Sequence, residues 1–173
     1  MQQREHGLFQ DGTRQGSLRT YSGPMVLDAV RERVMARYSA YAHLLDDGHI
    51  ESWAECFTPD GRLETTRPLL VVGRENLIEF GRLWLLAQRG PTRHSTWHHE
   101  LAQDGDLITG RCSAALLQTT EAGVSIVFTA TYRDVFEFHD EDWRIRHRHV
   151  SMDAPLVRTP SEPAAKRNLH AVE

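Results

Sequence analysis

Residues 24–61 read PMVLDAVRERVMARYSAYAHLLDDGHIESWAECFTPDG and contain the most regular hydrophobic pattern of the chain. From residue 27 to residue 45, apolar side chains recur at steps of three and four residues, which is typical of an amphipathic helix. Pro24 suits the first turn of such a helix and Gly48 its end. The pattern therefore predicts a helix over 24–47, a second short helix over 50–57, and a turn at Thr-Pro-Asp-Gly, residues 58–61.

Outward from this stretch, the pattern changes from helical to alternating. Two short strands are predicted at 63–66 and 69–72, and a third helix at 74–87. Beyond residue 92, period-two segments are separated by turn sequences. They predict four strands, at 92–103, 107–120, 124–138 and 143–153. Helices followed by an antiparallel meander indicate an α+β fold, in which a curved sheet over helices leaves a pocket between the layers.

Length and composition limit the possible classes of protein. The 173 residues fit one domain, which we expect at 24–156, with a tail or arm at 1–23 and a tail at 157–173. With 20 basic and 24 acidic residues the formal charge is −4, which argues against nucleic-acid binding. The two cysteines form no C-x-x-C motif, and we see no leader segment or apolar run that could span a membrane. These features favour a cytoplasmic protein without a membrane partner.

Several short motifs, in a fixed order, resemble the SnoaL-like proteins, which have the nuclear transport factor 2-like cone fold. The motifs are Leu-Leu-Asp-Asp-Gly at 44–48, Trp-Ala-Glu-Cys-Phe-Thr-Pro-Asp-Gly at 53–61, Arg-His at 93–94, Asp-Gly-Asp at 104–106, and Trp-Arg-Ile at 143–145 with Arg148. The resemblance covers about residues 25–153. It implies an α+β cone in which N-terminal helices pack in a curved antiparallel sheet. The motifs are most similar to those of scytalone dehydratase and the bile-acid dehydratases, and they also resemble the small (β) subunits of ring-hydroxylating dioxygenases.

Four residues are candidates for catalysis. Asp46 would lie at the C-terminal end of a helix, where a carboxylate opposes the helix dipole and needs a compensating partner. We expect it to point into the cone and to orient a histidine, as in a carboxylate–imidazole pair. His94 lies at the head of a predicted strand, and an imidazole suits proton abstraction beside a carbonyl. Tyr41 is about 140° around the helix from Asp46, so only the resemblance to the dehydratases implies that the two converge. The same resemblance implies a pocket role for Arg148, paired with Asp46 or bound to a substrate oxygen.

Each of these residues also has a plain structural interpretation. Asp46 would then be a solvated residue before a turn, Tyr41 a core residue, His94 a satisfied structural histidine, and Arg148 a charge at the edge of the sheet. Arg144 and Arg146 share a face with Arg148 by alternation, so the sequence leaves open which arginine points inward.

The predicted pocket wall is apolar and aromatic. Its candidate residues are Tyr38, Trp53, Trp84, His98, Leu116, Phe128 and Tyr132. Strand alternation places His98 on the same face as His94. The strand spacing of these two histidines is too long for a shared ion, and no zinc spacing or nucleotide-binding glycine motif is present. We therefore expect neither a metal nor a cofactor.

Two functions from different classes follow from these residues and from the resemblance. The first is a cofactor-independent acid–base lyase of the dehydratase type, or an isomerase or cyclase, acting on an apolar carbonyl substrate, polycyclic or polyketide-like. The alternative is a structural small subunit of a ring-hydroxylating dioxygenase or a small-molecule binding module. Under both, the resemblance implies a homo-oligomer, a trimer or a dimer.

Overall fold

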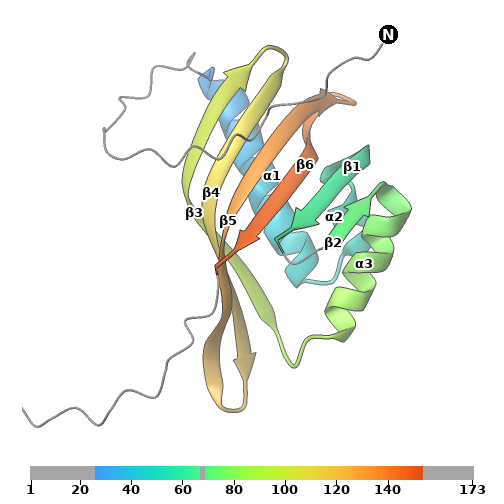
Figure 1. Cartoon of the computed structure of the whole chain (residues 1–173), viewed down its shortest axis with the longest axis vertical. Helices are drawn as coiled ribbons and strands as arrows, with labels where there is room; N and C mark the ends of the chain where they lie inside the picture. Colours follow the sequence, from blue (N-terminus) through green and yellow to red (C-terminus); the bar gives the residue numbers. More distant parts are fainter. Residues whose placement is uncertain (1–25, 67–68, 154–173) are drawn as a thin grey trace, which may run out of the picture.

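The computed structural model describes residues 26–66 and 69–153, which form three helices and one curved sheet (Figure 1). The helices are α1 (Asp28–Asp46), α2 (Ile50–Ala54) and α3 (Arg74–Leu86). The strands are β1 (Phe57–Thr65), β2 (Leu69–Val72), β3 (Thr92–Asp104), β4 (Leu107–Thr120), β5 (Gly123–His139) and β6 (Asp142–Met152). The α+β class is confirmed, and the predicted tails lie outside the described residues.

The sheet has the order β2-β1-β6-β5-β4-β3. Strands β3 to β6 form the predicted antiparallel meander. The strand β1 joins this meander by pairing parallel with β6, and β2 adds an antiparallel edge beside it. This parallel pairing joins β1, which precedes α3 in the chain, to the last described strand, and the resulting open sheet curves around α1 (Figure 1).

The predicted turn at residues 58–61 is instead part of β1. The pairing of β1 with β6 is irregular between Phe57 and Arg62, so these turn-forming residues make a bulge rather than a chain reversal. Gly61 is required there, since a Cβ atom would lie 2.7 Å from the Phe57 Cβ and 2.9 Å from the Thr58 carbonyl oxygen. These residues interrupt the regular strand pairing, but the prediction of a turn at 58–61 is wrong.

One face of α1 packs into the concave side of the sheet. Its buried residues are Val34, Tyr38, Tyr41 and Leu45, each 5% exposed or less. They follow the three- and four-residue steps of the sequence pattern. Around them, Trp53 of α2, Phe57 of β1 and Phe136 of β5 complete a core of fully buried aromatic side chains. The other face of α1 is polar and exposed.

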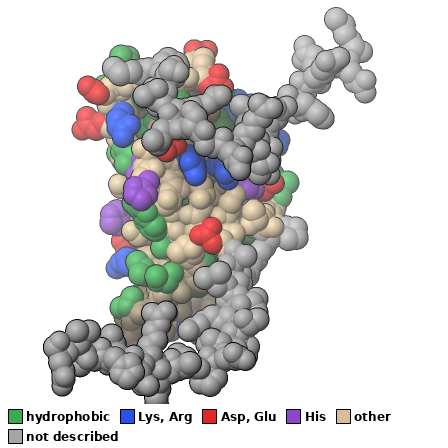
Figure 2. Space-filling model, turned by 60° about the vertical axis from the view of Figure 1, so that its left-hand side comes forward, with side chains coloured by type: hydrophobic (Ala, Val, Ile, Leu, Met, Phe, Trp, Pro, Cys, Tyr) green, Lys and Arg blue, Asp and Glu red, His purple; other side chains and the backbone are tan. Residues whose placement is uncertain are grey.

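The surface on the β3 side of the molecule is mixed in character. Figure 2 shows acidic, basic, histidine and hydrophobic side chains interspersed over this side. Exposed apolar residues on β5 include Val124 and Ile126. Among the described helices, none combines the length and the apolar character that crossing a membrane requires.

Candidate active site

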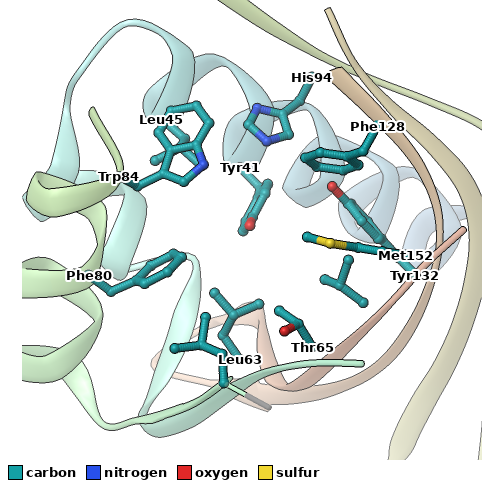
Figure 3. A pocket seen from close by; sticks show the side chains of 12 residues that line it. Tyr41, Leu45, Leu63, Thr65, Phe80, Trp84, His94, Phe128, Tyr132 and Met152 are labelled. Carbon is teal, nitrogen blue, oxygen red and sulfur yellow. The ribbon is translucent and has the colours of Figure 1, made fainter. Parts of the chain in front are cut away.

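An apolar cavity of about 250 Å³ opens between α1, α3 and the concave face of the sheet (Figure 3). Most of its wall is aliphatic or aromatic, and its polar groups come from two tyrosines, a threonine, a histidine and the indole N–H of a tryptophan. The lining residues are Tyr41, Leu45, Leu63, Thr65, Leu69, Phe80, Trp84, His94, Phe128, Tyr132, Val150 and Met152. A mostly apolar wall with a few convergent polar groups is typical of small-molecule sites.

Asp46 and His94 form a buried pair at this wall. The Asp46 Oδ1 atom lies 2.7 Å from the His94 Nδ1 atom, and the two side chains are only 3% and 5% exposed. The Asp46 Oδ2 atom accepts a hydrogen bond of 2.6 Å from the backbone N–H of His94. Since a carboxylate accepts, Nδ1 carries the proton, and Nε2 is left as the basic nitrogen of the ring.

The ends of two elements create this pair. Asp46 is the last residue of α1, and Thr92 and His94 begin β3. The Thr92 hydroxyl donates a third hydrogen bond, of 3.3 Å, to Asp46 Oδ1. The backbone and side-chain donors of β3 therefore compensate a carboxylate that the helix dipole would disfavour. Asp47, the next residue, is half exposed and pairs with Arg93 instead.

Tyr41 lies at the cavity wall beside this pair. Its ring centroid is 6.2 Å from that of His94, in an edge-to-face arrangement. Burial raises the pKa of Tyr41, although the nearby Arg148 guanidinium opposes that shift. Burial likewise raises the pKa of Tyr132 on the facing strand β5. Both phenols therefore stay protonated at ordinary pH and are able to donate a hydrogen bond into the cavity.

Arg148 pairs with Asp134 and not with Asp46. Its Nε and Nη2 atoms donate to the two Asp134 carboxylate oxygens at 2.7 and 3.0 Å, and both side chains are fully buried. Its guanidinium carbon lies 4.1 Å from the ring centroid of Tyr41 and 4.6 Å from that of Tyr132. The arginine therefore supports the two tyrosines from behind, and it is not among the cavity-lining residues.

The sheet register decides which arginine of β6 points inward. Arg148 is the direct cross-strand partner of Asp134, and the β5–β6 pairing slips next to Val135. Because this irregularity breaks the simple alternation, Arg146 is exposed and pairs with Glu137 at 3.6 Å. Arg144 pairs with Asp140 at 3.5 Å.

Sequence reasoning missed Asp134, although one signal was present. Every second residue in this part of β5 is buried, namely Tyr132, Asp134 and Phe136. A single carboxylate between two aromatic residues on the core face needs a buried cation as its partner.

His98 lies outside the cavity, so the prediction from strand alternation that it shares the His94 face of the wall is wrong. The β3–β4 register shifts between Trp97 and Glu100, and His98 takes a left-handed conformation with a φ of 55°. This bulge turns His98 outward and brings His99 against the Tyr38 ring, with centroids 4.7 Å apart. His98 instead lines a separate polar pocket on the surface.

The other predicted wall residues divide into two groups. Trp84, Phe128 and Tyr132 line the cavity. Tyr38, Trp53 and Leu116 are buried in the core and do not line it. Within residues 26–66 and 69–153, no group of three or more histidine, cysteine, aspartate or glutamate side chains has an arrangement that could hold a metal ion.

A curved, mostly antiparallel sheet around a long helix, with an internal apolar cavity, is the architecture of the nuclear transport factor 2-like class. The model of the SnoaL-like domain family matches residues 29–149, so the chain belongs to this family.

Comparison with solved structures supports the same assignment. A protein of unknown function from Mycobacterium tuberculosis is 31% identical to this chain. The match covers 78% of this chain and 77% of that protein, with a TM-score of 0.68. A protein from Catenulispora acidiphila, solved in complex with S-DNPA, is 22% identical over 73% of this chain and 96% of its own, with a TM-score of 0.69. The β subunit of a predicted aromatic-ring-hydroxylating dioxygenase from Novosphingobium aromaticivorans is 19% identical, over 73% of this chain and 90% of its own, with a TM-score of 0.61. No curated protein sequence matches the chain significantly.

Proposed function

We propose that the protein is a cofactor-independent acid–base enzyme, a dehydratase or an isomerase, that removes a proton beside the carbonyl group of an apolar ring-containing substrate. The observation that carries this proposal is the hydrogen bond of 2.7 Å between Asp46 Oδ1 and His94 Nδ1, at the wall of an apolar cavity. The bond fixes the tautomer in which Nε2 is the base.

His94 is the proposed general base. When Nε2 takes a proton from the substrate carbon, the imidazole becomes a cation, and the adjacent Asp46 carboxylate stabilises that charge. The two side chains are almost fully buried, and this low-dielectric surrounding strengthens the interaction. Such a positioned base contributes about 10²- to 10⁴-fold to the rate.

Tyr41 is the proposed donor to the substrate carbonyl oxygen. Proton abstraction moves negative charge onto that oxygen, and a protonated phenol at the cavity wall is able to stabilise it. Burial raises the pKa of Tyr41, which keeps the donor protonated. The paired Arg148 and Asp134 hold the tyrosine ring in place from behind.

The resulting enol has two outcomes with the same groups. Where the substrate carries a hydroxyl group on the next carbon, the C–O bond breaks, a double bond forms, and the leaving hydroxyl takes a proton from the imidazolium or a phenol to depart as water. Where the substrate instead carries a β,γ carbon–carbon double bond, the imidazolium returns the proton to the γ-carbon of the dienol, and the double bond shifts into conjugation with the carbonyl. Both outcomes are redox-neutral and balance without a further reactant.

The alternative, a structural dioxygenase subunit, has one specific discriminator. A purely structural His94 would be sealed in the core with no cavity beside it. His94 instead lines a cavity of about 250 Å³, which supports the catalytic proposal. The S-DNPA complex of the Catenulispora acidiphila protein also supports a ligand-binding role for this fold.

Exchange of protons for deuterium tests this proposal without knowledge of the natural substrate. The bicyclic ketone 2-tetralone would be incubated with the protein in D₂O. NMR would then measure how fast the signals of the protons beside the carbonyl disappear. We expect acceleration over buffer, and a fall of about 100-fold or more in His94→Ala. His98→Ala is the matched control, since this histidine is on the same strand but outside the cavity. Equal exchange in His94→Ala and in the unmodified protein would contradict the proposal.

A further inference from the structure

Trp84 is the aromatic residue that lies against His94 at the cavity wall. It comes from α3, whereas His94 comes from β3. Their ring centroids are 5.3 Å apart, the ring planes are inclined by 37°, and both rings line the cavity (Figure 3). Building on the proposed function, we propose that Trp84 is the positioning residue for His94, which holds the imidazole in place and stabilises its protonated form.

The hydrogen bond to Asp46 fixes only one side of the imidazole. A histidine ring rotates broadly about its last side-chain torsion, and a single bond at Nδ1 leaves a tilting motion of the ring unrestrained. Tyr41 of α1 presents its ring edge-to-face to His94, with centroids 6.2 Å apart. Trp84 of α3 contributes the nearer aromatic surface, so the imidazole is bounded by rings from two different helices.

The indole ring also favours positive charge on the imidazole. A cation within about 6 Å of an aromatic centroid is attracted to the ring face, and tryptophan gives the strongest attraction. The 5.3 Å separation lies inside that range. Because a general base becomes a cation as it takes the proton, this attraction grows during the reaction, when it lowers the barrier.

A substitution of Trp84 leaves the chemical identity of the other groups around His94 unchanged. From α1 come the Asp46 carboxylate and the Tyr41 phenol, and from β5 comes the Tyr132 phenol at the same cavity. Arg148 of β6 lies behind the two tyrosine rings, and Asp134 pairs with it. A change in the titration of His94 on altering Trp84 therefore reports on Trp84 itself.

A simpler role for Trp84, shielding of His94 from water, predicts the opposite result. Removing a shield admits water, which favours the charged imidazolium and moves its titration midpoint to higher pH. Removing a cation–π partner disfavours the imidazolium and moves the midpoint to lower pH. The direction of the change separates the two roles.

The experiment is an NMR titration of the His94 ring in the full chain, with its signal among those of ten histidines identified by its loss in His94→Gln. We expect Trp84→Leu to move the midpoint down by about half a pH unit or more, and Trp84→Phe by less. Phe80→Leu is the matched control, because Phe80 lies one turn earlier on α3, lines the same cavity and makes its ring contact with Trp53. An unchanged or raised midpoint in Trp84→Leu, or an equal fall in Phe80→Leu, would overturn the proposal.

The titration tests the role of Trp84 and the exchange assay tests the proposed function, so the failure of one proposal can be distinguished from the failure of the other. The titration needs no substrate, so absent exchange by the unmodified protein would refute the proposed function while the Trp84 result still stands. Conversely, active exchange with a midpoint that Trp84→Leu does not lower would refute the role of Trp84 alone. Trp84→Phe keeps an aromatic ring at the position, and partial retention of the midpoint and of the exchange rate in this variant supports the role.

Discussion

Asp46 holds His94 by accepting two hydrogen bonds, one from the ring Nδ1–H at 2.7 Å and one from the backbone N–H at 2.6 Å. One carboxylate thus positions both the side chain and the strand that carries it. Because the two bonds use different carboxylate oxygens, the orientation of the Asp46 side chain is fixed, and with it the nitrogen that faces the cavity.

Asp46→Asn tests this arrangement. The amide oxygen is able to keep the backbone bond, but the amide nitrogen then donates to Nδ1, and the proton moves to Nε2, where it blocks the base. We expect the exchange rate with 2-tetralone to fall by about 100-fold or more, as a tautomer change does in histidine catalysis. Asp47→Asn, at the adjacent exposed residue, is the control and should keep full activity. Full activity in Asp46→Asn would refute the tautomer argument.

The role of Tyr41 as donor makes a separate prediction. Tyr41→Phe removes the hydroxyl group and keeps the ring, so we expect exchange to fall by about 100-fold, a typical cost of losing one donor to a developing oxyanion. Tyr38→Phe is the control, because Tyr38 lies on the same helix and is buried but does not line the cavity. Equal effects of the two variants would argue for a packing role only.

Three buried tyrosines predict how stability depends on pH. Burial raises the pKa values of Tyr38, Tyr41 and Tyr132. In the unfolded chain each phenol ionises near pH 10, whereas in the folded protein it stays neutral to higher pH. The contribution of these tyrosines to the free energy of unfolding should therefore be constant below about pH 10 and fall as the pH rises further. Urea denaturation at pH 9 to 11 would measure this, and a smaller decline in Tyr41→Phe would attribute part of it to Tyr41.

Much of the fold could be predicted from the sequence because its signals are local. The helical period of residues 24–47, the alternation beyond residue 92 and the turn sequences depend only on neighbouring residues. The end of α1 and the start of β3 also indicated the proximity of Asp46 and His94, since the carboxylate at a helix C-terminus needed a partner. The short motifs resembling the SnoaL-like proteins supplied the rest of that expectation.

The remaining features depend on register, which local patterns do not determine. The outward turn of His98 requires a bulge between Trp97 and Glu100, and one extra residue reverses the alternation after it. The pairing of Arg148 with Asp134 requires the exact β5–β6 alignment. In both cases the outcome is set by contacts between strands that lie many residues apart.

Arg148 and Asp134 should behave as a buried pair whose halves depend on each other. Both side chains are fully buried, so Arg148→Met or Asp134→Leu leaves an uncompensated charge in the core, at a cost of about 3 to 5 kcal/mol in the free energy of unfolding. The double variant Arg148→Met/Asp134→Leu should be less destabilised than the sum of its single changes. Arg146→Met is the control for an exposed ion pair and should change stability by less than about 1 kcal/mol. Additive losses in the double variant, measured by urea denaturation, would contradict the dependence.

The pairing of Arg148 also predicts which ligands the cavity accepts. Its lining residues include no lysine or arginine, and the nearby Arg148 charge is already neutralised by Asp134. A carboxylate in the cavity would lose its water without gaining a lysine or arginine partner for its charge. Neutral 2-naphthol should therefore bind at least about 100-fold more tightly than the anionic 2-naphthoate of similar shape at neutral pH, measured by calorimetry.

A pair of adjacent variants assigns this binding to the cavity. Leu69 lines the cavity and Leu70 does not, although both are exposed. Leu69→Trp should block 2-naphthol, because the larger ring fills the space at the wall, and Leu70→Trp should leave the affinity unchanged. Tight binding of 2-naphthoate that Leu69→Trp abolishes would contradict this prediction, because it would mean that the cavity offers the ligand a positive charge, from His94 or from an Arg148 that has left Asp134.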